Sequence, residues 1–121
     1  MQLSTLLHPQ SIAIIGASTQ EGSVGWSLAK NIIEQFPGPS FPINPKTTEL
    51  FGKPCFPSVL SVESEIDLAL IAVPAALVPT VLKECGEKRI PTAVIISAGF
   101  KETGEAGKSL EEEVLRIAEE Y

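Results

Sequence analysis

The sequence contains few of the residues from which metal sites and disulfide frameworks are built. Its 121 residues include two cysteines, Cys55 and Cys85, and one histidine, His8. No CxxC motif occurs, so we expect no metal site, and two reduced thiols rather than a disulfide. His8 stands in a His-Pro dipeptide ahead of the first apolar run, which is typical of a surface turn.

Basic charge and long apolar runs are also scarce. Nine basic residues stand against fifteen acidic ones, and the net charge of −6 argues against a nucleic-acid or anionic-membrane surface. The longest apolar stretch, Leu68 to Val78, contains Pro74 and is too short to span a bilayer. The opening residues MQLSTLLHP carry no basic segment ahead of their apolar run, so we expect no signal peptide. These features favour a soluble, cytoplasmic protein.

The overall composition is that of an ordinary globular chain. Hydrophobic residues make up 44% of the sequence and charged residues 20%. A chain of this length hides roughly two-thirds of its unfolded surface on folding, which is enough for a core of its own. We therefore expect one domain, residues 1–121.

Nearly apolar runs alternate with helical patterns along the chain. The runs 11–15, 66–73 and 92–96 are typical of strands buried on both faces, and a further strand is expected near 40–43. Apolar residues at helical spacing follow from Val24 to Phe36, where Pro37-Gly38 ends the run, then after Pro74 from Leu77 to Cys85, and again over 110–121. The order predicts an α/β fold of Rossmann-like type, a three-layer doubly wound parallel sheet with helices on both faces.

Two regions refine this prediction. Six of the ten prolines lie between Pro37 and Pro57, so we expect an irregular sheet edge there with one or two short strands. An α/β repeat would continue with a strand after the last helix, so we expect the chain to be an N-terminal part of a longer protein. The single tryptophan, Trp26, is expected to pack against the sheet, and a position of its ring beside the ligand is the alternative.

A glycine-rich segment, residues 16–25 (GASTQEGSVG), joins the first strand to the first helix. Doubly wound folds bind nucleotide phosphates at this junction, because glycines allow close backbone approach and the opening N–H groups of the helix point at the anion. The hydroxyl groups of Ser18, Thr19 and Ser23 are candidate donors. The same segment is also compatible with a turn that only connects two elements.

The ligand class follows from the end of the second strand. The glycine segment matches neither G-x-G-x-x-G nor the P-loop pattern. The second strand ends in Ile43-Asn44-Pro45-Lys46, with a lysine where an NAD site would have an acidic residue. Lys46 suits a ligand that carries phosphate on its ribose, and both NADP and coenzyme A meet that description. A solvated turn lysine is the alternative interpretation.

Several segments together resemble a known family. SIAIIGAS, GSVG, INPK, VPAALVP and ISAGFKETGEAG occur in this order from about residue 7 to 121. They are similar to the CoA-binding N-terminal domain of the NDP-forming (ADP-forming) acyl-CoA synthetases, which are related to the succinyl-CoA synthetase α subunit. The resemblance implies coenzyme A as the ligand.

The resemblance also implies a role for individual residues, all of them in ligand binding and none in catalysis or metal binding. The glycine segment would hold the nucleotide and pyrophosphate, the end of the second strand would meet the ribose phosphate, and two further strand ends would complete the site. These residues are Gly16, Ser18, Gly22, Ser23, Val24, Gly25, Pro45, Lys46, Val73, Pro74, Ala75, Ser97, Ala98 and Gly99. Pro74 and Gly99 are also compatible with simple strand termination.

In a complete enzyme of this family, acyl-CoA, ADP and phosphate are converted to acid, CoA and ATP, or the reverse. The resemblance implies that this chain positions the CoA thiol while a phosphohistidine domain and an ATP-grasp module, in the same chain or another subunit, perform the chemistry. Two alternatives remain open. One is a non-catalytic CoA- or dinucleotide-binding sensor, and the other is the synthetase-like arm of a protein lysine acetyltransferase.

Overall fold

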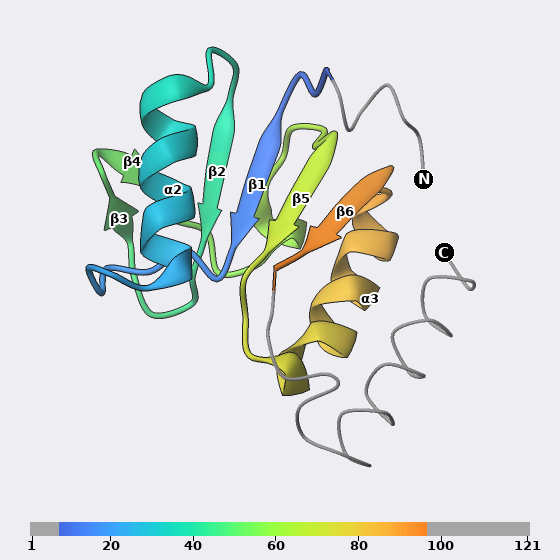
Figure 1. The fold of residues 1–121 in the computed structure, drawn as a ribbon. Helices are drawn as coiled ribbons and strands as arrows, with labels where there is room; N and C mark the ends of the chain where they lie inside the picture. The colour runs from blue at the N-terminus through green and yellow to red at the C-terminus, as the bar shows by residue number, and fades with distance from the viewer. Residues whose placement is uncertain (1–7, 97–121) are drawn as a thin grey trace.

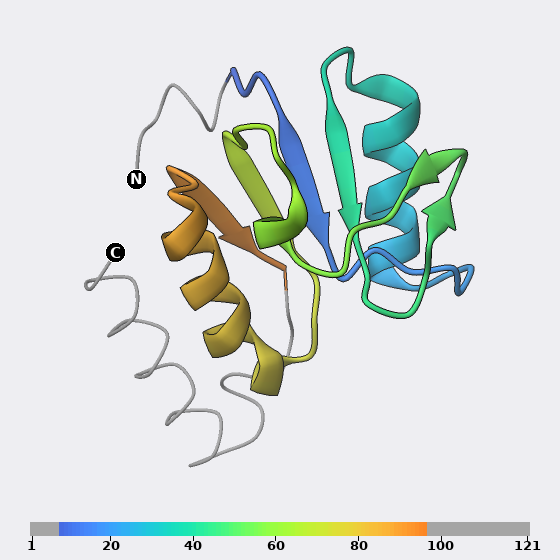
Figure 2. The same cartoon turned by 180° about the vertical axis from the view of Figure 1, so that it is seen from behind.

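The computed structural model describes residues 8–96 and shows a parallel sheet between two layers of helix (Figures 1 and 2). Four parallel strands lie in the order β2-β1-β5-β6. Helix α2 covers one face and helix α3 covers the other, so the predicted three-layer doubly wound sheet is confirmed. The main elements are β1 (Ile12–Ile15), α2 (Val24–Gln35), β2 (Ser40–Ile43), β5 (Leu68–Ile71), α3 (Val78–Lys88) and β6 (Thr92–Ile95). The helix expected over 110–121 lies outside the described residues.

Strand β1 is buried along its whole length, as its apolar sequence IAII predicts. Ile12 and Ile14 point into a cluster with Ala29 of α2. Ala13 and Ile15 point into a second cluster on the α3 side. The alternation of side chains along the strand therefore supplies both layers of the core at once.

The two helices begin and end where local chemistry requires. Helix α2 starts after Ser23, whose hydroxyl oxygen accepts a hydrogen bond from the amide of Trp26, and it ends before Pro37. On the other face, a short 3-10 turn, η2 (Ala75–Leu77), precedes α3, which is continuous only from Val78. The left-handed backbone of Arg89 terminates α3.

The proline-rich region forms one edge of the sheet, as expected. Strand β2 contains Pro42 and lies at the end of the strand order. The amide of Phe56 donates to the Pro42 carbonyl at 2.9 Å, and the amide of Asn44 donates to the Phe56 carbonyl at 2.9 Å, so this segment covers the open edge of β2. Before it, β3 (Glu49–Leu50) and β4 (Lys53–Pro54) form a small antiparallel hairpin.

Two details differ from the expectation. Strand β5 is limited to Leu68–Ile71 rather than 66–73, and the Asp67 side chain accepts a hydrogen bond from the amide of Gln10 at 2.8 Å. Trp26 does not pack into the sheet. Its ring contacts Phe51 at the tip of the β3–β4 hairpin, with a centroid distance of 5.7 Å, and the Lys30 ammonium lies 5.4 Å from the Trp26 ring centre.

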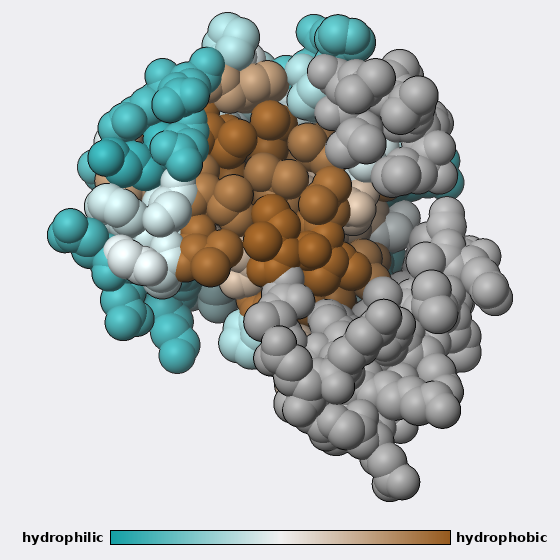
Figure 3. Space-filling view, viewed as in Figure 1, coloured by the Kyte–Doolittle hydropathy of each residue, from teal (hydrophilic) through white to brown (hydrophobic). Residues whose placement is uncertain are grey.

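Among residues 8–96, the sheet face beside α2 is covered unevenly. Figure 3 shows an apolar area next to the hydrophilic surface of α2. The core cluster on this face includes Leu70 of β5 and Val94 of β6, which are only partly buried. Helix α2 contacts β1 and β2, so the half of the face formed by β5 and β6 has less cover. Within residues 8–96, no helix is long and apolar enough to cross a membrane.

Candidate functional site

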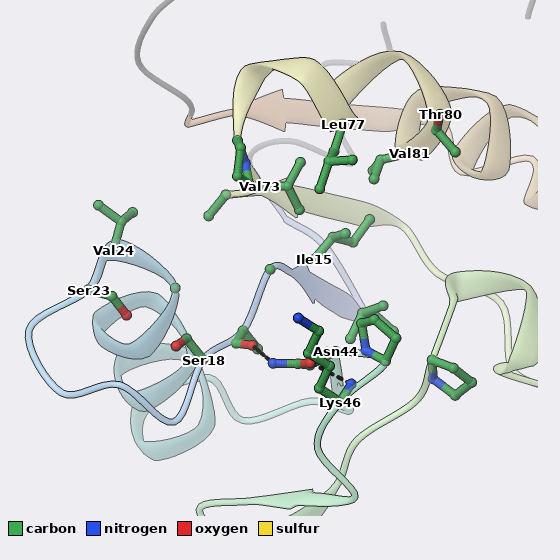
Figure 4. Close-up of a pocket in the computed structure, with 18 of the residues that line it drawn as sticks. Ile15, Ser18, Ser23, Val24, Asn44, Lys46, Val73, Leu77, Thr80 and Val81 are labelled. Atoms are coloured by element: carbon green, nitrogen blue, oxygen red, sulfur yellow. Dashed lines mark hydrogen bonds between the residues drawn. The ribbon is translucent and has the colours of Figure 1, made fainter.

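A pocket of about 730 Å³ opens at the carboxyl ends of β1, β2 and β5, between the start of α2 and the start of α3 (Figure 4). Open α/β sheets bind ligands at this edge. The structure brings together most of the residues singled out from the sequence. Those that line the pocket are Gly16, Ser18, Ser23, Val24, Gly25, Pro45, Lys46, Val73 and Pro74. Gly22 and Ala75 do not line it, and Ser97, Ala98 and Gly99 lie outside the described residues.

The glycines at the two ends of the β1–α2 loop are required by the backbone itself. A Cβ on Gly25 would lie 1.9 Å from the Gly16 carbonyl oxygen, so the first turn of α2 packs directly on that carbonyl. Gly16 has a φ of +95°, and a Cβ there would lie 2.6 Å from the Ala72 carbonyl oxygen of the strand end behind it. These two glycines serve the fold whatever the ligand is.

The start of α2 presents free donors to the pocket. Among the described residues, the amide N–H groups of Val24 and Gly25 have no acceptor, as expected for the first turn of a helix. Together with the positive end of the helix dipole, they form a site suited to an anion.

The two serines of this loop play different parts. The Ser23 hydroxyl donates to the Gln20 carbonyl at 2.8 Å and accepts from Trp26, so its hydrogen bonds are used within the loop. The Ser18 hydroxyl oxygen accepts from the Gln20 amide at 3.0 Å, but its proton has no acceptor among the described residues. Ser18 is therefore the serine with a donor available to a ligand.

Asn44, which the sequence reasoning did not assign a role, connects the two loops beneath the pocket. Its side-chain N–H group donates to the Ala17 carbonyl at 2.7 Å, and its side-chain oxygen accepts from the Lys46 amide at 2.8 Å. The Lys46 turn is thereby held against the β1–α2 loop (Figure 4). The signal was present in the sequence, since an asparagine directly before a turn proline commonly bonds to the backbone two residues on.

The opposite side of the pocket is a stripe that starts at Leu77, the last residue of η2, and continues along α3 through Thr80, Val81 and Glu84. These residues recur at helical spacing on one face. In the sequence, Leu77 and Val81 are two of the apolar residues at helical spacing that follow Pro74. Val81 packs against the core, but Leu77 is 51% exposed and faces the pocket. Thr80 and Glu84 were not identified from the sequence.

Charge in the pocket is sparse. Among the described lining residues, Lys46 is the only cation and Glu84 the only anion. Glu84 accepts a hydrogen bond from the Ser58 hydroxyl at 2.8 Å, whereas Lys46 forms no ion pair with any described residue. The cationic side chain and the free amides of α2 are therefore available to hold a phosphorylated ligand.

Nucleophilic chemistry is not favoured here. Burial, and then the nearby Glu84 carboxylate, raises the pKa of the Cys85 thiol to about 12, so this thiol is protonated at neutral pH. Burial and Glu49 also raise the pKa of Cys55. His8 is exposed and is not a lining residue. Within residues 8–96, no group of three or more histidine, cysteine or acidic side chains could hold a metal ion.

Comparison with known proteins decides the family. The sequence matches the CoA binding domain family over residues 10–121. The chain belongs to this family. It is 49% identical over 119 residues to an acetate–CoA ligase (ADP-forming) I of Archaeoglobus fulgidus. That match covers 98% of this chain and 17% of the ligase. It is 50% identical over 120 residues to an acetate–CoA ligase (ADP-forming) of Methanocaldococcus jannaschii, covering 99% of the chain and 17% of that protein.

Solved structures give the same result. The fold superimposes with a TM-score of 0.91 on the dinucleotide forming acetyl-coenzyme A synthetase 1 of Ca. Korarchaeum cryptofilum in complex with phosphate and ADP. The two sequences are 39% identical, and the match covers 99% of this chain and 26% of that one. The predicted family is confirmed, and so is the predicted ligand: family membership favours coenzyme A over NADP. The chain spans only about a sixth of the length of the two ligases.

Proposed function

We propose that the pocket binds the nucleotide end of coenzyme A and so places the pantetheine thiol for acyl transfer carried out by other domains. The observation that carries this proposal is the convergence of the free Val24 and Gly25 amides with Lys46 at one sheet edge. The amides and the Ser18 hydroxyl would hold the pyrophosphate, and Lys46 would hold the ribose phosphate. Pro45, Val73 and Pro74 supply apolar contacts around them.

Anchoring a remote part of the substrate is a catalytic contribution in its own right. The phosphorylated end of CoA does not react, but its binding energy restricts where the thiol can move. The described lining residues supply backbone amides, hydroxyl groups, Lys46 and one carboxylate, Glu84, and of these the amides, the hydroxyls and the lysine suit the anchoring of phosphate groups.

The complete enzyme in this proposal converts acyl-CoA, ADP and phosphate to acid, CoA and ATP, or runs the reverse reaction. Residues 1–121 form its N-terminal CoA-binding domain, and phosphohistidine and ATP-grasp modules are its partners. One support is the greater length of the ligases. Another is a Pyrococcus furiosus relative that is named as the α subunit of an acetate–CoA ligase (ADP-forming). The chain is 42% identical to it over 126 residues, and the match covers 27% of that subunit. Two unpaired thiols, Cys55 and Cys85, are consistent with the cytoplasmic location that we propose.

Calorimetric titration of the chain with CoA, 3′-dephospho-CoA and NADP tests this function. The affinity for CoA should exceed the affinity for 3′-dephospho-CoA by about tenfold or more, because the extra phosphate gains a charge-assisted contact with Lys46. Lys46→Ala should reduce that preference to about threefold or less, whereas Lys53→Ala, which removes a lysine of β4 outside the pocket, should keep it. Tighter binding of NADP, or an undiminished preference in Lys46→Ala, would contradict the proposal.

A further inference from the structure

Glu84 is the one charged group of the pocket that the proposed function leaves without a role. It lies on the α3 stripe, in a pocket assigned to a ligand that carries several phosphate groups. A carboxylate there repels phosphate, so the ligand group that meets Glu84 must be one other than a phosphate.

The carboxylate is held in a defined position. Ser58 donates its hydroxyl proton to Oε1 of Glu84 at 2.8 Å, and the same hydroxyl accepts from the Leu60 amide at 3.1 Å. This pair ties α3 to the 3-10 helix η1 (Val59–Ser61). Oε2 of Glu84 accepts no hydrogen bond from the described residues. Because an ionised carboxylate only accepts hydrogen bonds, the ligand group that meets it must be a donor.

Backbone hydrogen bonds place this carboxylate near the Lys46 turn. The segment that carries Pro57 and Ser58 follows Phe56, whose backbone pairs with Pro42 and Asn44 at the end of β2. The turn that carries Pro45 and Lys46 starts at the same point. Lys46 and Glu84 line the same pocket, so a ligand whose ribose phosphate lies at Lys46 can direct the base attached to that ribose toward Glu84.

Most of the lining surface of the pocket is apolar. Pro45, Pro57, Leu77 and Val81 are among the lining residues, and Figure 4 shows Leu77 at the end of η2, with Thr80 and Val81 on α3, across from Asn44 and Lys46. Proline rings and aliphatic side chains suit a flat heteroaromatic ring better than a chain of amides. In coenzyme A, the ring attached to the phosphorylated ribose is adenine.

We propose that Glu84 accepts a hydrogen bond from the exocyclic amino group of the adenine base and so makes the pocket selective for an amino-bearing base. The inference rests on the proposed function, because it places the ribose phosphate at Lys46. A base with an oxo group at the same ring position presents an acceptor to the carboxylate, which leaves two acceptors facing each other.

The test compares CoA with its deaminated analogue, in which hypoxanthine replaces adenine, by calorimetric titration. The unmodified chain should bind CoA about tenfold or more tightly, the effect of one hydrogen bond to a charged group. Glu84→Gln should abolish the preference for CoA or reverse it, because the glutamine oxygen keeps the bond from Ser58 and its NH2 group, which then faces the base, donates to an oxo group but cannot accept from an amino group. The exposed Glu87 of the same helix is the matched control, and Glu87→Gln should keep the full preference.

The outcomes separate this inference from the proposed function. If the unmodified chain binds CoA and its deaminated analogue equally well, the assignment of Glu84 is overturned and CoA binding is left intact. This first comparison needs no variant. An unchanged preference in Glu84→Gln also overturns it; the glutamine oxygen still accepts from Ser58, so the variant should unfold at the same temperature as the parent. If folded, unmodified chain binds no CoA, both proposals fail.

Discussion

The two sides of the pocket are built from different parts of the polypeptide. The α2 side, formed by Gly16, Ser18 and the start of α2, presents mainly backbone, and its two glycines allow peptide groups to lie in direct contact. The α3 side presents side chains, namely Leu77, Thr80, Val81 and Glu84. A backbone surface suits an anion whose charge is the same in every CoA ester, whereas a side-chain surface suits recognition of shape and hydrogen-bonding pattern.

This difference separates two kinds of mutational effect. A substitution on the α2 side alters how a helix packs on a strand end, so it acts first on folding. A substitution on the α3 side changes groups that project from a helix already packed through Val78 and Cys85, so it acts first on binding. The variants below test that separation.

The largest effect is expected for Gly25→Ala. The new methyl group would lie 1.9 Å from the Gly16 carbonyl oxygen, and neither backbone segment can move without disturbing the junction of β1 and α2. We expect a loss of about 3 kcal/mol or more in the free energy of unfolding, measured by urea denaturation.

Gly22 of the same loop is the control for Gly25→Ala. Unlike Gly25, it has a positive φ, and a Cβ there would meet no atom within 4 Å. Gly22→Asn should therefore cost about 1 kcal/mol or less, because asparagine tolerates the left-handed region. Similar losses for both variants would show that backbone contact is not what distinguishes the α2 side.

An intermediate effect is expected for Asn44→Ala. The change removes the bond to the Ala17 carbonyl and the bond from the Lys46 amide, so the Lys46 turn is no longer tied to the β1–α2 loop. We expect a loss of about 2 kcal/mol in the free energy of unfolding, together with weaker CoA binding. Asn31→Ala, at an exposed position of α2, should change neither quantity; an equal loss there would refute the role given to Asn44.

The smallest effect on stability is expected for Leu77→Ala on the α3 side. Since Leu77 is 51% exposed, the free energy of unfolding should change by about 0.5 kcal/mol or less, while CoA affinity should fall by about threefold or more. Leu60 of η1 is similarly exposed at 47% but does not line the pocket, so Leu60→Ala should leave affinity unchanged. A Leu77 variant that binds CoA normally would remove the α3 side from the site.

Sequence reasoning succeeded where local chemistry decides the structure. The apolar run at β1 and the Pro37-Gly38 pair after α2 gave those elements nearly their true bounds, because burial and missing backbone donors act locally. It was less successful where distant segments decide. Trp26 lies against Phe51 because the β3–β4 hairpin reaches α2, and Glu84 enters the pocket because η1 packs beside α3. Neither contact has a signature at one position of the sequence.

The central claim is that the start of α2 and the Lys46 turn hold the phosphorylated end of CoA. Its most direct test is an amide NMR titration of the isotope-labelled chain with CoA. The account predicts that the largest shifts fall on the Val24 and Gly25 amides, with further shifts in the turn from Asn44 to Lys46. The result that would contradict it is saturable binding in which these amide signals do not shift and the signals of Trp26 and Phe51 shift instead. Those two aromatic residues contact each other and do not line the pocket.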